Sequence, residues 1–83
     1  MNKVLVFVYV PMLEHKYEVW IPINRKIHTV ISLITKEINQ LTENVFPISS
    51  NLCFYNRKTG MIYDKNLIIK ETDIRNGIEL VLI

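Results

Sequence analysis

The stretch that decides the fold is KIHTVISLITKEINQLT, residues Lys26 to Thr42. Large aliphatic residues recur in it at alternating intervals of four and three positions: Ile27, Ile31, Ile34, Ile38 and Leu41. On a helix of about 3.6 residues per turn, this spacing gathers the side chains into one stripe, which Val30 and Leu33 widen. Polar residues occupy the opposite side. The pattern predicts an amphipathic α-helix over Lys26–Thr42.

Strand-like segments lie on both sides of this helix. They are rich in β-branched and aromatic residues and are separated by proline, glycine or asparagine. The predicted strands are Val4–Val10, Lys16–Ile21, Asn51–Tyr55, Met61–Tyr63 and Ile78–Ile83. A single helix among strands must bury its stripe against a sheet. We therefore expect an α+β domain, with one helix packed across one face of a mixed sheet of four to five strands.

The connections carry typical turn signals. Pro11 and Pro22 should end the first two strands, because proline cannot donate to a β-ladder. Gly60 and the Asn76-Gly77 pair supply residues that tolerate a left-handed backbone. In the loop Glu43–Ser50, Phe46 and Ile48 are expected to cover the end of the core.

Composition limits the function classes. The 83 residues leave room for one domain, expected over residues 1–83. Hydrophobic residues make up 49% and charged residues 22%, which is typical of a globular protein, and the net charge of +2 is too small to favour nucleic acid or an anionic membrane as the main partner. The single cysteine, Cys53, excludes an intramolecular disulfide, and no segment approaches the ~20 apolar residues that span a bilayer. We expect a cytoplasmic protein.

Alternation along the strands predicts which side chains leave the core. Inward-facing residues should be Val4, Val6, Val8, Val10, Tyr17, Val19, Ile21, Leu52, Phe54, Ile78, Leu80 and Leu82. Because the helix covers only one face, the other face should present an apolar patch, which usually marks an interface. Its predicted members are Leu5, Phe7, Tyr9, Trp20, Tyr55 and Val81. The alternative is a register shifted by one residue, which would place some of them in the core.

No set of residues predicts catalysis. Cys53 lies between Leu52 and Phe54, without a base or a helix N-terminus, so a structural thiol is favoured over a nucleophile. His15 and His28 belong to no cluster with metal-ligand spacing, and no glycine-rich phosphate loop is present. We expect neither enzymatic activity nor a metal or cofactor. The basic pairs Arg25-Lys26 and Arg57-Lys58 are more typical of solvated turns than of a nucleic-acid site.

The chain resembles ubiquitin and its relatives over nearly its whole length. Three segments carry the resemblance: Trp20–Val30, where a strand ends at proline before a helix; Leu52–Tyr55, similar to the third strand; and Asn66–Leu82, similar to the closing "leucine, turn, isoleucine, turn, strand" signature. The resemblance implies a β-grasp fold. Three further features are Pro22, five residues before the first core position of the helix, the aliphatic-rich helix itself, and the end on Leu80-Val81-Leu82-Ile83. In these the chain is most similar, within that superfamily, to the YukD/EsaB-like proteins of Gram-positive type VII (WXG100) secretion systems.

That resemblance implies a cytoplasmic accessory or regulatory protein without catalytic residues. Its partners would be membrane proteins of the secretion machine, some carrying a related domain. The apolar patch also allows a homodimer through that sheet face. Ubiquitin and similar sulfur carriers end in a Gly-Gly tail, whereas the only glycines here are Gly60 and Gly77, so conjugation is not expected. The alternatives are a β-grasp adaptor of another bacterial or mobile-element system, and a weak nucleic-acid binder that stacks bases on Phe7, Tyr9 and Trp20.

Overall fold

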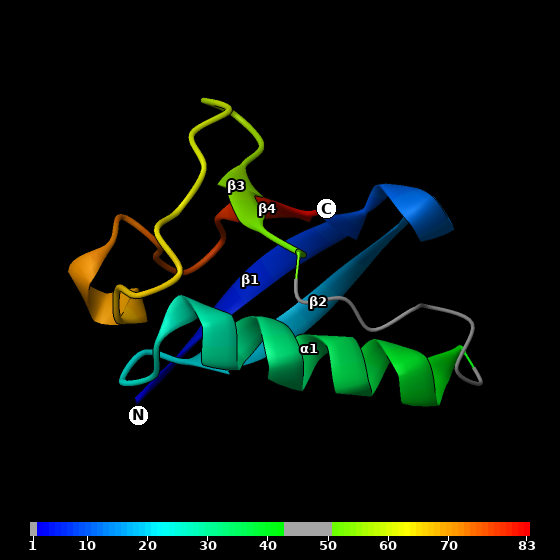
Figure 1. Cartoon of the computed structure of the whole chain (residues 1–83), viewed down its shortest axis with the longest axis horizontal. Coiled ribbons are helices and arrows are strands. Elements are labelled where there is room, and N and C mark those ends of the chain that lie inside the picture. Colours follow the sequence, from blue (N-terminus) through cyan, green and yellow to red (C-terminus); the bar gives the residue numbers. More distant parts are fainter. Residues whose placement is uncertain (1, 43–50) are drawn as a thin grey trace.

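One helix packs across one face of a four-stranded mixed sheet in the computed structural model, which describes residues 2–42 and 51–83 (Figure 1). In chain order the elements are β1 (Lys3–Val10), a 3₁₀ turn (Pro11–Leu13), β2 (His15–Pro22), α1 (Ile27–Leu41), β3 (Phe54–Asn56), a 3₁₀ turn (Ile69–Glu71) and β4 (Glu79–Leu82). The spatial order of the strands is β2-β1-β4-β3. The predicted α+β class is confirmed.

Strand β1 lies in the middle of the sheet. It pairs antiparallel with β2, where Val6 is opposite Val19, and parallel with β4, where Val8 is opposite Leu80. Strand β3 pairs antiparallel with β4. A strand flanked on both sides and covered by a helix loses contact with water on both edges and one face. This position explains why Val6, Val8 and Val10, on the covered face of β1, are fully buried.

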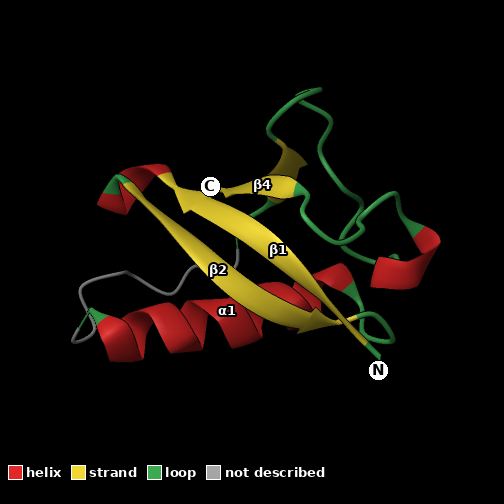
Figure 2. Ribbon diagram, turned by 180° about the vertical axis from the view of Figure 1, so that it is seen from behind, coloured by secondary structure: helices red, strands yellow, loops and turns green. Residues whose placement is uncertain are grey.

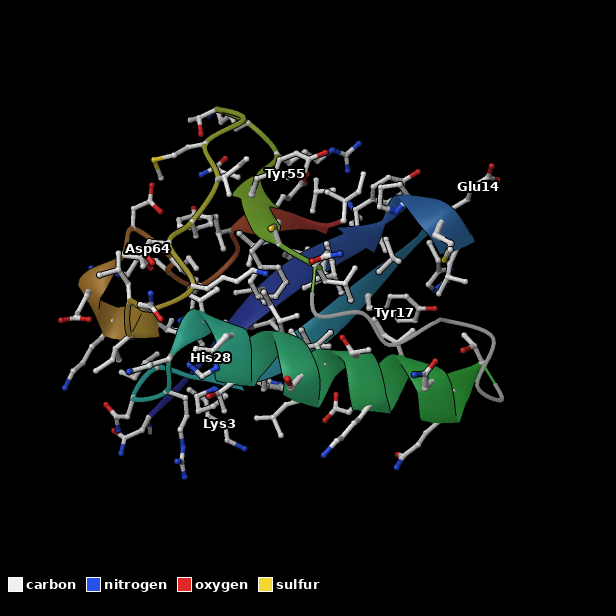
Figure 3. All side chains as sticks on the ribbon, viewed as in Figure 1. Lys3, Glu14, Tyr17, His28, Tyr55 and Asp64 are labelled. Atoms are coloured by element: carbon white, nitrogen blue, oxygen red, sulfur yellow. The ribbon has the colours of Figure 1, made fainter. Side chains whose placement is uncertain are left out.

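The core lies between the sheet and α1. Val6, Val8 and Val10 are fully buried there, as are Phe54 of β3 and Leu80 of β4 on the same face of the sheet. The predicted register of β1 is therefore confirmed. Tyr17 and Val19 of β2 face the same core but are only half-buried, and Figure 3 shows Tyr17 extending from β2 toward α1.

Helix α1 begins without a side-chain cap, because its N-cap residue is Lys26. Backbone carbonyls from a distant segment replace the cap. The Ile27 amide donates to the Leu67 carbonyl at 2.9 Å, and the His28 amide donates to the Lys65 carbonyl at 3.2 Å. Two of the amides that every helix leaves unpaired are thereby satisfied by tertiary contacts.

The predicted helical stripe is correct except at its margins. Leu41 is 72% exposed and Leu33 is 46% exposed, whereas Thr35 and Asn39 are buried. Leu41 belongs to the last turn of α1, where the helix and β2 have diverged from one another (Figure 1). Thr35 tolerates burial because its hydroxyl donates to the Ile31 carbonyl at 2.7 Å. The predicted role of Phe46 and Ile48 falls outside the described residues.

Residues Met61–Tyr63 do not form the predicted strand. Only Ile62 makes an isolated bridge, to Tyr55. The buried Asn56 side chain explains the difference, since its Oδ1 accepts hydrogen bonds from the amides of Lys58 (2.8 Å) and Thr59 (3.2 Å). The chain is thereby held in a tight turn directly after β3, and Gly60 adopts a left-handed φ of 77°. The sheet therefore has four strands.

Candidate protein-interaction face

In the described part of the chain, the face of the sheet opposite α1 carries no helix, and Figure 2 looks onto it. We call it the open face. Cross-strand pairing arranges its side chains in rows: Leu5 lies opposite Trp20, Phe7 lies between Glu18 and Glu79, and Tyr9 lies between Lys16 and Val81. Tyr55 lies on the far side of Val81. The structure thus brings all six predicted interface residues to one face.

Trp20 is the most accessible of the six. It is 54% exposed, whereas Leu5, Phe7, Tyr9 and Tyr55 are half-buried. Trp20 also borders a shallow groove of about 170 Å³ between the edge of the sheet and α1, where Lys3, Leu33 and Glu37 line it. A large aromatic side chain at the rim of a groove is typical of an anchor residue in protein interfaces.

The prediction that Val81 belongs to the accessible patch is wrong. Its register places it on the open face, but it is only 4% exposed. The reason is its position between Tyr9 of β1 and Tyr55 of β3, two large side chains directly opposite it on neighbouring strands. Val81 therefore supports these rings and offers no accessible surface to a partner.

A charged band crosses the same face. Glu79 of β4 contacts Lys16 (Nζ–Oε1, 3.8 Å) and Arg57 (Nη1–Oε2, 3.5 Å). The Lys16 ammonium lies 5.7 Å from the centre of the Phe7 ring, and the Arg57 guanidinium lies 5.2 Å from that of Tyr9. Cations at these distances are attracted to the electron-rich face of a ring. The band divides the open face into two apolar ends.

The first apolar end consists of Trp20 and Leu5. The second apolar end contains Tyr55 and extends further than predicted. The bridge to Tyr55 adds Ile62, which is 66% exposed. Ile83, which is hydrogen-bonded to Cys53, adds to the same end. Sequence alternation indicated that Lys16, Glu79 and Ile83 face outward. The contact of Lys16 and Arg57 with one glutamate could not be foreseen, since it depends on the register of β4 with β1 on one side and with the end of β3 on the other.

The remaining candidate residues stay apart. Cys53 is half-buried, and its thiol lies 3.5 Å from the Asn51 carbonyl. Within residues 2–42 and 51–83, no group of three or more His, Cys, Asp and Glu residues could hold a metal ion. In those same ranges, no helix is long and apolar enough to cross a membrane.

Comparison with solved structures identifies proteins that have a similar fold. No family model and no curated protein sequence matches the chain. Among solved structures, the ubiquitin-like domain of an Arabidopsis thaliana protein superposes with a TM-score of 0.70 at 18% identity, over 100% of this chain and 78% of that one. A chain from a structure on molecular mimicry of SUMO in DNA repair superposes with a TM-score of 0.74 at 11% identity, over 100% of this chain and 92% of that one.

A third similar structure is the MycP5-free ESX-5 inner membrane complex, with a TM-score of 0.72 and 14% identity. The match covers 99% of this chain but only 21% of the chain in that complex. Identities this low establish the fold and nothing further. Together with the sheet order and the single covering helix, they show that this chain has the ubiquitin-like β-grasp fold.

Proposed function

We propose that the protein is a non-catalytic interaction module that binds another protein through its open face, with Trp20 as the anchor. The observation that carries this proposal is the half-exposed Trp20 side chain on a sheet face without a covering helix. Tryptophan is among the residues most enriched at binding hot spots. The Lys16–Glu79–Arg57 band would supply the polar contacts that orient a partner.

The proposed setting is cytoplasmic, as an accessory component of a type VII (WXG100) secretion system. Support comes from two features that resemble the YukD/EsaB-like proteins: Pro22, five residues before the first core position of the helix, and the aliphatic-rich helix itself. Further support comes from the ESX-5 inner membrane complex, where a domain of this fold is part of a longer chain in a membrane assembly. Genes for WXG100 proteins and a membrane ATPase beside this gene would support the setting. Their absence would favour an adaptor of another system.

The proposed role of the open face is tested by measuring how this protein binds the purified cytoplasmic parts of membrane proteins that are encoded beside its gene. We expect Trp20→Ser to weaken binding by about thirtyfold or more, because truncating a hot-spot residue costs about 2 kcal/mol or more. Leu41→Ser is the matched control, since Leu41 is also an exposed apolar side chain but lies on α1. Equal weakening by both variants, or by neither, would contradict the proposal.

The nucleic-acid alternative makes a different prediction. Stacking of bases on Phe7, Tyr9 and Trp20 would bind a fluorescent single-stranded oligonucleotide, with an affinity that falls steeply as salt rises. The band holds only two cations, and both contact Glu79. We therefore expect no salt-dependent change in the anisotropy of the oligonucleotide.

A further inference from the structure

Within residues 2–42 and 51–83, strand β2 is an edge of the sheet, with β1 on one side and no strand on the other. The hydrogen bonds of β1 show which groups of β2 point outward. Odd-numbered residues of β1 bond toward β4, since the Phe7 amide donates to the Ile78 carbonyl and the Leu5 carbonyl accepts from Gly77. Even-numbered residues of β1 therefore bond to their odd-numbered partners on β2, such as Val19 opposite Val6.

The backbone groups of Lys16, Glu18 and Trp20 consequently point away from the sheet. They have no strand partner in the described part of the chain. Their side chains lie on the open face, because they pair with Tyr9, Phe7 and Leu5. Such an edge is ready to accept another extended strand.

The charges on this edge are self-complementary. Lys16 and Glu18 are both exposed and lie two residues apart on the same face. Lys16 makes one long ion pair, to Glu79, and its ammonium also lies over the Phe7 ring, whereas Glu18 forms no ion pair within residues 2–42 and 51–83. An antiparallel copy of the same strand can place each cation opposite the other copy's carboxylate.

We propose that β2 is the docking edge for a second copy of this chain, in the register that places Lys16 of each copy opposite Glu18 of the other. Only even-numbered residues of β2 have backbone groups that point outward, so the register between the two copies can change only in steps of two residues. A shift of two in one direction places Glu18 opposite Glu18, and a shift of two in the other places Lys16 opposite Lys16. Like charges directly opposite each other destabilise a pair of strands, so both neighbouring registers are disfavoured.

The other face of the edge fits the same register. It places Tyr17 opposite Tyr17 at the two-fold axis and His15 opposite Val19. Tyr17 and Val19 are half-buried in the single chain, and the His15 ring lies 4.5 Å from that of Tyr17. Pairing would cover this exposed aromatic surface on the side that faces α1. The two-fold axis runs perpendicular to the sheet, so the two open faces join into one surface with a Trp20 on each half.

Sedimentation velocity with charge-reversed variants tests this proposal. We expect the wild type to dimerise and Glu18→Lys to weaken the dimer by about tenfold or more, because two attractive cross-strand pairs become repulsive. Lys16→Glu should weaken it similarly. The double variant Lys16→Glu/Glu18→Lys should restore the dimer, since the pairs are exchanged and the net charge is that of the wild type.

Lys70→Glu is the matched control for Lys16→Glu, because Lys70 is an exposed lysine in the Ile69–Glu71 turn. It should leave the dimer unchanged. A wild type that stays monomeric at the highest soluble concentration would overturn the proposal, and would indicate that the charges protect the edge from pairing. A double variant that fails to regain the dimer while remaining folded by circular dichroism would overturn it as well.

Amide hydrogen exchange identifies the strand involved. In the dimer, the Lys16 and Glu18 amides should exchange more slowly than at concentrations where the monomer dominates. A dimer in which these two amides stay fast, and which Trp20→Ser dissociates while Glu18→Lys does not, would place the contact on the open face and refute edge pairing. Because partner binding is measured separately, failure here leaves the proposed function standing.

Discussion

Tyr63 joins two segments of the chain through its buried hydroxyl group. The hydroxyl donates a hydrogen bond to the Asp73 carboxylate at 2.7 Å and accepts one from the Asn56 side-chain amide at 3.2 Å. Burial, followed by the hydrogen bond to Asp73, raises the pKa of Tyr63 to about 12. The folded chain therefore holds this phenol in its neutral form.

The raised pKa predicts how stability depends on pH. In the unfolded chain Tyr63 ionises near its ordinary pKa of about 10. Below that pH both states bind the proton and the stabilisation is complete. Between pH 10 and about 12 only the unfolded state releases the proton, so the free energy of unfolding should fall with rising pH.

Tyr63→Phe checks this interpretation by urea unfolding at a series of pH values. At pH 7 the variant should lose about 1–2 kcal/mol in the free energy of unfolding, because the hydrogen bonds to Asp73 and Asn56 are lost. Its stability should also fall less steeply than that of the wild type above pH 10. If the free energy of unfolding fell equally with pH in the wild type and the variant, Tyr63 would not titrate as described.

Gly60 supplies a second prediction at the scale of one residue. Its φ of 77° is a conformation that residues with a Cβ rarely adopt, and no heavy atom lies within 4 Å of a Cβ built there. Gly60→Ala should therefore cost about 1 kcal/mol through backbone strain alone. Lys58→Ala in the same turn is the control, and chemical denaturation of the two variants should separate them. Equal stability would mean that the turn does not need a left-handed residue.

At the scale of elements, α1 offers adjacent residues with opposite environments. Ile34 is buried against the sheet, whereas Leu33 lies at the rim of the groove beside Trp20. Ile34→Ala should lower the free energy of unfolding by about 2–4 kcal/mol because it opens a cavity. Leu33→Ala should cost less than about 1 kcal/mol. Similar losses for the two variants would contradict the orientation of the helix.

The elements also show what sequence can predict here. Residue spacing predicted α1 within one residue at each end and the inward face of β1, because a 3.6-residue or two-residue period directly reflects burial. Burial of Val81 and the failure of Met61–Tyr63 to form a strand were missed. Both depend on contacts between distant segments: Tyr9 and Tyr55 beside Val81, and the amides that bond to Asn56.

At the scale of the molecule, the single helix determines which surface remains for partners. Covering one face of a four-stranded sheet leaves the open face to solvent, and the strand order leaves β2 as a free edge. The open face was predicted from the single helix and the alternation along the strands, whereas the free edge at β2 was not predicted, because it depends on the spatial order of the strands. Predicting the charged band on the open face required the strand register.

Binding at the open face is the central claim, and one NMR titration tests it most directly. The chain has a single tryptophan, so its indole N–H gives one unique signal. Adding the cytoplasmic part of a membrane protein that is encoded beside this gene to the ¹⁵N-labelled protein should shift the indole signal and the amide signals of Leu5 and Phe7. Shifts confined to the exposed side of α1, at Ser32 and Lys36, with an unchanged indole signal, would contradict the claim.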